Sequence, residues 1–157
     1  MARRRQAEKR QTTVDPKFNS VLVSRFINFL MRSGKKNTAR RIVYGALDSL
    51  AEKNPGVNTL DMLQRSIDNA KPRIETKARR VGGATYQVPL EIPVERQTAL
   101  AMRWIVNFAD SRKGVPMKEA LASELMEAFQ GQGNAIRKRD DVHKMAQANK
   151  AFAHFRW

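Results

Sequence analysis

Residues 73–92 read RIETKARRVGGATYQVPLEI and interrupt a sequence whose other apolar residues recur at helical spacing. On both sides of the Gly82-Gly83 pair, apolar or small residues alternate with charged or polar ones, as in half-buried strands. Two glycines tolerate the positive φ angles that a tight hairpin turn needs. Pro72 ends the preceding helical pattern and Pro93 opens the next one. The stretch therefore predicts a β-hairpin that protrudes from a helical body.

The hairpin carries cations near its tip, at Lys77, Arg79 and Arg80. An extended two-stranded arm with a cationic end suits the groove or the backbone of a nucleic acid. The tip itself, Val81-Gly82-Gly83-Ala84, has no large side chain. Spacing alone leaves a second interpretation open, in which the hairpin packs on the body and its arginines are merely solvated.

The net charge favours a polyanionic partner. The 157 residues include 30 Lys or Arg and 15 Asp or Glu, a formal net charge of +15. Folding does not need this excess, and self-repulsion makes it a cost. The cations also gather in separate groups, which is typical of a folded nucleic-acid-binding protein. The groups are Arg3, Arg4, Arg5, Lys9 and Arg10; Arg32, Lys35, Lys36, Arg40 and Arg41; Lys71, Arg73, Lys77, Arg79 and Arg80; and Arg137, Lys138, Arg139 and Lys144.

The length and the apolar pattern predict one mainly α domain over residues 18–157. It is expected to be a bundle of about six helices, with the hairpin at about 73–92 between the third and the fourth. Residues 1–17 are polar and basic and cannot bury enough apolar surface to fold alone. We expect them to form a flexible basic arm that orders on RNA.

Local signals within the bundle give four further expectations. Ser20 and Thr59 are expected to cap the first and third helices. Val21 is expected on the apolar face of the first helix. Trp104 is interpreted as a packing residue of the fourth helix rather than a base-stacking one.

Patterns of catalysis, metal binding and membrane insertion are absent from the sequence. There is no cysteine, and His143 and His154 lack ligand spacing, so we expect no metal, no cofactor and no enzyme activity. His143, beside Asp141 and Lys144, is expected on a solvated helix face. No apolar run approaches the ~20 residues of a membrane span, and no secretory signal is expected.

The separate motifs together resemble one family, the bacterial-type small-subunit ribosomal protein seven. The segments RRVGGATYQVP (79–89), LAMRWI (100–105) and ANKAFAHFRW (148–157) are similar to that family, and the similarity runs from end to end. The N-terminal signature spacing is matched by Leu22, Phe26-Ile27, Gly34-Lys35-Lys36, Ile42-Val43 and Ala46. The chain departs from the family at PVERQ (93–97), where members often carry more arginine. Only Arg96 is therefore assigned to RNA there.

This resemblance implies a structural role in the small ribosomal subunit. Members bind the 3′ major domain of 16S ribosomal RNA and nucleate assembly of the head, and the hairpin lies near exit-site transfer RNA at the subunit interface. The residues carried over as RNA-binding are Arg3, Arg4, Arg5, Lys9, Arg10, Lys35, Lys36, Arg40, Arg41, Lys71, Arg73, Lys77, Arg79, Arg80, Arg96, Lys138 and Arg139. The tip residues near transfer RNA are Arg79, Arg80, Val81, Gly82, Gly83 and Ala84, and Arg156 and Trp157 form the C-terminal tail.

The resemblance also implies further partners and a location. The neighbours in the subunit are small-subunit ribosomal proteins nine and eleven, and some members bind the messenger RNA of their own operon. The expected location is the cytoplasm, with an organellar ribosome as the alternative. Without the resemblance, the rival is an architectural DNA-binding protein, which needs an apolar wedge at the arm tip that this chain lacks. A second rival is a cationic protein of membrane surfaces, which needs a basic amphipathic helix with an aromatic face. The aromatic residues of this chain are instead expected in a shared core.

Overall fold

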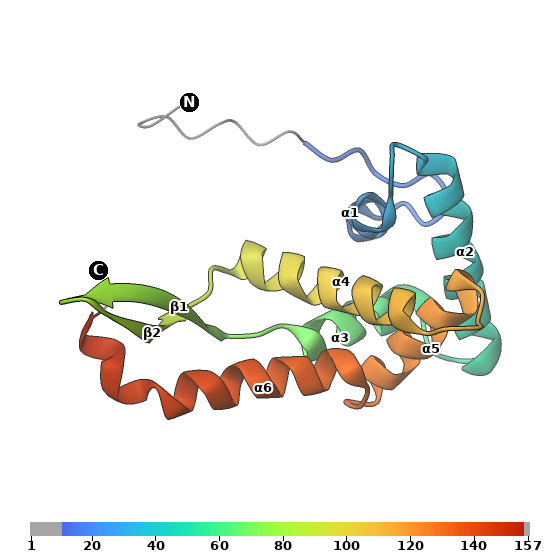
Figure 1. The fold of residues 1–157 in the computed structure, drawn as a ribbon. Helices are drawn as coiled ribbons and strands as arrows, with labels where there is room; N and C mark the ends of the chain where they lie inside the picture. The colour runs from blue at the N-terminus through green and yellow to red at the C-terminus, as the bar shows by residue number, and fades with distance from the viewer. Residues whose placement is uncertain (1–10, 156–157) are drawn as a thin grey trace.

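The computed structural model describes residues 11–155. Seven residues of the expected site lie outside this range: the RNA-binding residues Arg3, Arg4, Arg5, Lys9 and Arg10, and the tail residues Arg156 and Trp157. The described chain runs through α1 (Val21–Leu30), α2 (Lys36–Lys53), α3 (Thr59–Ala70), β1 (Ile74–Val81), β2 (Ala84–Glu91), α4 (Val94–Ser111), α5 (Met117–Phe129), α6 (Asn134–Ala148) and the 3₁₀ helix η1 (Lys150–Phe155). The predicted fold class, a helical bundle with a hairpin between the third and fourth helices, is confirmed. Figure 1 shows the hairpin at one end of the molecule and α1 with the start of α2 at the other.

The hairpin has the geometry that its sequence predicts. Strands β1 and β2 are antiparallel and pair without interruption from Ile74 with Glu91 to Val81 with Ala84. The two-residue turn has φ values of 57° at Gly82 and 90° at Gly83. Positive φ at both central residues matches the right-handed twist of the strands, and a side chain at either position would strain the backbone.

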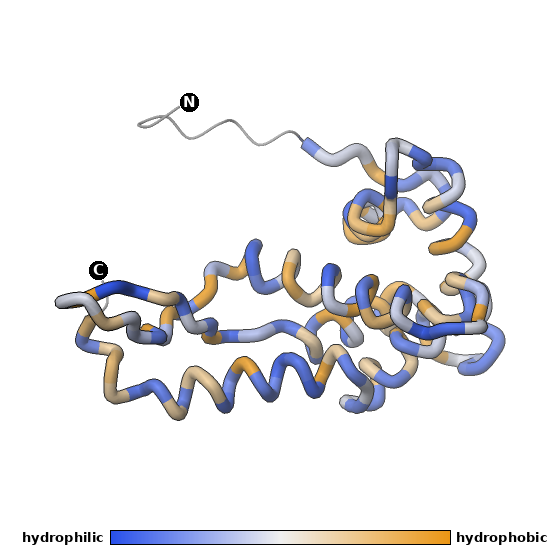
Figure 2. Tube along the Cα trace, in the orientation of Figure 1, coloured by the Kyte–Doolittle hydropathy of each residue, from blue (hydrophilic) through white to orange (hydrophobic). Residues whose placement is uncertain are grey.

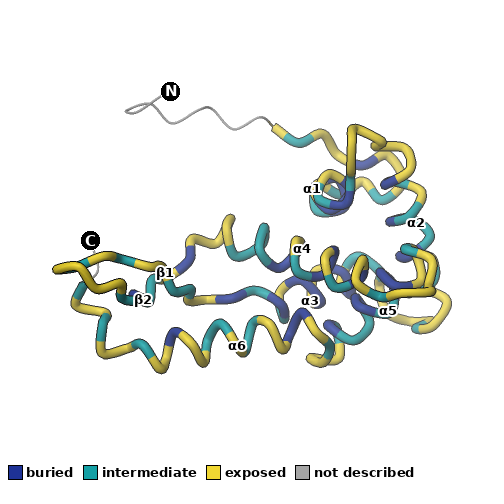
Figure 3. Tube along the Cα trace, viewed as in Figure 1, coloured by how far each residue is buried: buried dark blue, intermediate teal, exposed yellow. Residues whose placement is uncertain are grey.

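The core lies where α5 packs against α2, α3 and α4. Its largest fully buried apolar side chains are Phe26, Ile27, Leu47, Leu50, Met62, Leu63, Ile67, Met102, Ile105, Leu121 and Leu125. In Figure 3 the buried stretches lie in the helical body, whereas the outer part of the hairpin and much of α6 are exposed or intermediate. The body therefore carries the stability, and the hairpin extends from it.

The inward face of α1 differs from the expected one at its first residue. Val21 is 40% exposed, so its assignment to the apolar face is wrong, and Val23 is buried instead. On α4, which packs against α5, Ala101 and Met102 are fully buried. Trp104 is half-buried at the edge of this core, where it packs as predicted. It lines a small pocket between the base of the hairpin and α6.

The cap of α3 is a different residue from the expected one, and the expected cap of α1 makes no side-chain bond. The residue that caps α3 is Asn58, whose side chain accepts a hydrogen bond from the backbone N–H of Leu60, so the expectation of Thr59 is wrong. Asn and Thr are both good capping residues, and here the chain enters the helix one residue earlier than expected. Ser20 occupies the N-cap position of α1 but makes no side-chain capping bond.

A buried carboxylate that the sequence pattern did not indicate joins three helices. Glu124 on α5 is fully buried and accepts hydrogen bonds from Arg112 at 2.7 Å and from the backbone N–H of Ala135 at 3.1 Å. Arg112 also binds Glu127 at 2.7 Å. The hydrogen bonds that Arg112 donates to Glu127 and Glu124 raise its pKa above the ordinary value. This cluster fixes the end of α4 and the start of α6 to α5.

His143 joins α6 to the base of the hairpin, so the expectation of a solvated face is wrong. Its Nε2 accepts the backbone N–H of Arg73 at 2.9 Å, and its ring is half-buried. The pKa of His143 is lowered from its ordinary value, mainly by burial and then by the charges of Arg139 and Arg73, with Asp140 opposing. Burial arises because the hairpin folds back on α6, a contact that local spacing does not reveal.

His143 should make stability depend on pH. As pH falls through about 6.5, the unfolded chain takes up the proton first, because the folded pKa is lower. The contribution of His143 is therefore present above about pH 6.5 and is lost as pH falls towards the folded pKa. Melting temperatures between pH 7.5 and 5 should fall more steeply for the parent protein than for His143→Gln. His154→Gln, which changes the only other histidine, should keep the parental slope; equal slopes for parent and His143→Gln would contradict this account.

Candidate nucleic-acid interface

The junction between the α1–α2 loop and α2 presents two lysines, Lys35 and Lys36, whose side chains have no partner among the described residues. Gly34, with φ of 72°, turns the chain, and Lys35 and Lys36 follow it in exposed positions. The first turn of α2 contains no acidic residue. Cations at this end oppose the helix dipole, whose positive end favours anions. The two lysines are therefore unfavourable for the stability of α2, but they and the helix end together can bind a phosphate.

The next turn of α2 adds Arg40 and Arg41. Arg41 is exposed, whereas Arg40 is half-buried, and its Nε is buried without a hydrogen-bond partner in the described part of the chain. We call Arg32, Lys35, Lys36, Arg40 and Arg41 the loop patch. All five belong to one continuous stretch at the start of α2, which Figure 1 places at the opposite end of the molecule from the hairpin tip.

The segment before α1 is attached to α2 beside the loop patch. Asp15 is 3% exposed and accepts a hydrogen bond from the hydroxyl of Tyr44 at 2.8 Å. Burial raises the pKa of Tyr44, and the bond to Asp15 raises it further. Lys17 forms an ion pair with Asp48 at 2.8 Å. Since Tyr44 lies one turn from Arg40, Asp15 is held on α2 next to the loop patch.

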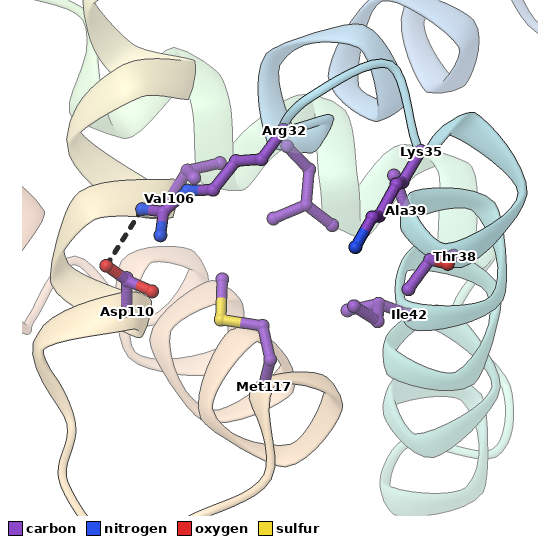
Figure 4. A pocket seen from close by; sticks show the side chains of 9 residues that line it. Arg32, Lys35, Thr38, Ala39, Ile42, Val106, Asp110 and Met117 are labelled. Atoms are coloured by element: carbon purple, nitrogen blue, oxygen red, sulfur yellow. Dashed lines mark hydrogen bonds and ion pairs between the residues drawn. The ribbon is translucent and has the colours of Figure 1, made fainter.

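A pocket of about 200 Å³ opens beside this loop. Figure 4 shows Lys35 and Arg32 at its edge and Ile42 and Met117 among its apolar lining. Arg32 forms an ion pair with Asp110 at 2.9 Å, which links the loop to α4. Sequence reasoning grouped Arg32 with the other cations but gave no signal for this pocket, because its walls come from four separate segments.

The hairpin carries a second group of cations, Arg73, Lys77, Arg79 and Arg80, which we call the hairpin patch. Arg73, Lys77 and Arg80 are exposed. Arg79 is half-buried and donates a hydrogen bond to the backbone carbonyl of Phe155. Because η1 contacts β2, one part of the hairpin is covered by protein. The two tip arginines therefore differ, since Arg79 is half-buried and Arg80 is exposed.

Two other expected contact residues form ion pairs within the protein. Lys71 binds Asp68 at 2.5 Å, and Arg96 binds both carboxylate oxygens of Glu75, at 3.0 and 2.9 Å. The second pairing raises the pKa of Arg96. In a bidentate pair the guanidinium is held in a fixed direction, so Arg96 has less freedom to meet a phosphate.

The basic residues of α6 also differ in their surroundings. Lys138 is exposed, as are Arg137 and Lys144, and none of these three has a partner among the described residues. Arg139 is half-buried, pairs with Asp140 at 2.6 Å and donates to the backbone carbonyl of Asn69 at 2.5 Å. Arg139 thus connects α6 to α3, while the exposed cations Arg137, Lys138 and Lys144 are accessible to a binding partner.

The structure does not bring the cations into one site. Figure 2 shows hydrophilic stretches along the hairpin, along α6 and at the loop before α2, with α4 running between the two ends. Such a distribution suits a partner that is large and folded, since one small anion cannot reach both ends. Residues 11–155 contain no group of His, Cys, Asp and Glu that could hold a metal ion. None of their helices is both long and apolar enough to span a membrane.

Comparison with known proteins decides the family. Residues 2–150 match the family model described as ribosomal protein S7p/S5e. The chain belongs to this family. Its relatives include the small ribosomal subunit protein uS7 of Akkermansia muciniphila, 56% identical over 157 residues and all of both chains. The uS7 proteins of Desulfotalea psychrophila, 54% identical over the whole of both chains, and of Fervidobacterium nodosum, 54% identical over 99% of each, are also similar.

Family membership confirms the sequence-based identification of a ribosomal protein. The S7p/S5e family consists of structural proteins of the ribosome and is not a family of enzymes. The two patches of the chain are thus surfaces of a ribosomal protein.

Proposed function

We propose that the protein is a structural component of the small ribosomal subunit and binds the 3′ major domain of 16S ribosomal RNA as a primary assembly protein. The observation that carries this proposal is the loop patch, in which Lys35 and Lys36 stand without partners at the positive end of a helix. Each phosphate that these cations neutralise releases condensed counterions, and this release drives binding.

The separation of the patches indicates how the protein acts in assembly. The loop patch and the hairpin patch are held at opposite ends of one packed body, so RNA segments bound at the two ends acquire a fixed spacing. A rigid body that fixes RNA helices where they converge favours one arrangement of the head. Ribosomal proteins nine and eleven and the operon messenger RNA belong to the proposal on family grounds, as does a cytoplasmic location in the small subunit.

The competing function, an architectural DNA-binding protein, lacks its central element in this structure. Such proteins unstack base pairs with an apolar wedge. The tip here is the Gly82-Gly83 turn, flanked by the small residue Ala84 and the half-buried Val81. The tip is narrow enough to approach a backbone but has nothing to insert between bases.

Binding to RNA and DNA should separate the two functions. We expect tight binding to a 3′ major domain transcript and at least about tenfold weaker binding to random duplex DNA at equal salt. The logarithm of the affinity for the transcript should fall with the logarithm of salt concentration, by about 0.7–0.9 for each phosphate contact. Filter binding or fluorescence anisotropy at 50–300 mM salt would measure both. Equal affinity for duplex DNA at physiological salt would refute the proposed partner.

The second proposed contact is between the hairpin tip and exit-site transfer RNA. Deletion of residues 81–84, with a new two-residue turn joining the strands, should leave the protein folded because none of these residues belongs to the core. Small subunits that carry the deletion should assemble normally and release exit-site transfer RNA several-fold faster. Poor assembly with normal release would assign the tip to assembly instead.

A further inference from the structure

One face of the outer hairpin is covered by the C-terminal helix η1 (Figure 1). The ring of Tyr86 on β2 lies 5.1 Å from the ring of Phe152 and 5.1 Å from that of Phe155, measured between centroids. Phe152 and Phe155 are themselves 6.4 Å apart and nearly parallel, at 14°. Tyr86 therefore packs against both aromatic side chains of this short helix, at the separations that aromatic pairs favour.

Arg79 makes a second contact between the same two elements. It is paired with Tyr86 across the hairpin, so both side chains leave the same face of the sheet. The guanidinium of Arg79 donates to the backbone carbonyl of Phe155, close to the ring that contacts Tyr86. A charged donor and an aromatic ring on facing strands thus hold one end of η1.

The opposite face of the outer hairpin is open. Successive side chains of a strand alternate between faces, so Arg80 points away from the face that carries Arg79. Its cross-strand partner Thr85 and the neighbouring Ala78 and Gln87 belong to this second face, and all four residues are exposed. Adjacent arginines at the tip therefore have different environments, one against η1 and one in solvent.

The hairpin needs support from outside itself to hold a defined direction. An isolated two-stranded hairpin is at best marginally stable in water. The bond from Arg73 to His143 and the pocket around Trp104 hold its base. Contacts further out along β2 come from η1. The direction of the tip therefore depends on a helix that contributes no residue to the main core.

We propose that η1 is a brace that fixes the direction of the hairpin tip, with Arg79 and Tyr86 as positioning residues and Arg80 as the residue that meets the nucleic acid. Only one part of this inference rests on the proposed function, namely that the nucleic acid is the exit-site transfer RNA. The brace itself is a property of the free protein.

Spin labels can measure the direction of the tip, because the chain has no cysteine of its own. Ala84→Cys at the turn and Asn107→Cys on the exposed side of α4 give one labelled pair. We expect a narrow distance distribution by pulsed electron paramagnetic resonance in the parent pair. Phe152→Ala combined with Phe155→Ala, which leaves the charge unchanged, should broaden the distribution at least twofold, and so should Arg79→Gln. Arg80→Gln is the matched control and should leave the width as it is.

Release of exit-site transfer RNA from small subunits carrying these variants is the second measurement. Arg80→Gln should speed release several-fold through the lost contact, and the double phenylalanine variant should do the same because the hairpin tip is misplaced.

Unchanged distance distributions in the phenylalanine and Arg79→Gln variants would overturn the brace, whatever the release rates. Faster release from Arg80→Gln but normal release from a broadened phenylalanine variant would overturn the positioning role. Normal release from Arg80→Gln itself would refute the proposed transfer RNA contact and leave the distance result standing.

Discussion

Arg112→Ala should lower the free energy of unfolding by about 3–5 kcal/mol, the cost of leaving a buried carboxylate without its partner. The unpaired group is Glu124, which is fully buried and keeps only the hydrogen bond from the backbone N–H of Ala135. Arg112 itself is 27% exposed, which favours the lower end of this range. Urea unfolding monitored by circular dichroism would measure the loss.

Two comparisons make this prediction specific. Arg103→Ala removes the same charge from the exposed side of α4, the helix that Arg112 follows, and should change stability by less than about 0.5 kcal/mol. Arg112→Met combined with Glu124→Met removes both charges and should cost less than the sum of the single changes, because neither charge is then buried alone. If Arg112→Ala resembles Arg103→Ala, the buried cluster contributes little to the fold.

This cluster also shows where reasoning from the sequence ends. Glu124 falls on the buried side of α5, between Leu121 and Leu125, and a carboxylate there gives no local sign of burial. Its partners Arg112 and Ala135 come from the neighbouring helices, so their proximity is a result of tertiary packing. The hairpin is the opposite case. Its register and turn follow from alternation and from Gly82-Gly83, which are properties of one short segment.

The candidate interface divides in the same way. Lys35 and Lys36 belong to a basic loop and Arg80 to a basic hairpin tip. Their exposure could be predicted from the sequence, because loops and hairpin tips lie on the surface. The different environment of Arg79 depends on Phe155, which is 76 residues away in the sequence. Arg139 and Arg96 likewise have partners within the fold. Composition therefore predicts that a surface is basic, and packing decides which of its cations are free.

Lys35→Ala combined with Lys36→Ala should weaken binding to the 3′ major domain transcript by roughly tenfold to a hundredfold at about 0.1 M salt, if each lysine neutralises one phosphate. Both side chains are exposed and lack partners among the described residues, so they are free to meet the RNA. The double change should also reduce the slope of log affinity against log salt by about 1.4–1.8. Thermal stability should barely change or rise slightly, because two cations leave the positive end of α2.

A control with equal charge distinguishes local contact from the net charge of the protein. Lys53→Ala combined with Lys113→Ala removes two exposed lysines from the far end of α2 and from the loop before α5. Because this pair lies outside the loop patch, it should reduce the affinity by less than about threefold and leave the salt slope nearly unchanged. Equal losses from the two double variants would mean that the RNA responds to the overall positive field. In that case the loop patch would have no special part in binding, and the positive end of α2 would not be a phosphate site.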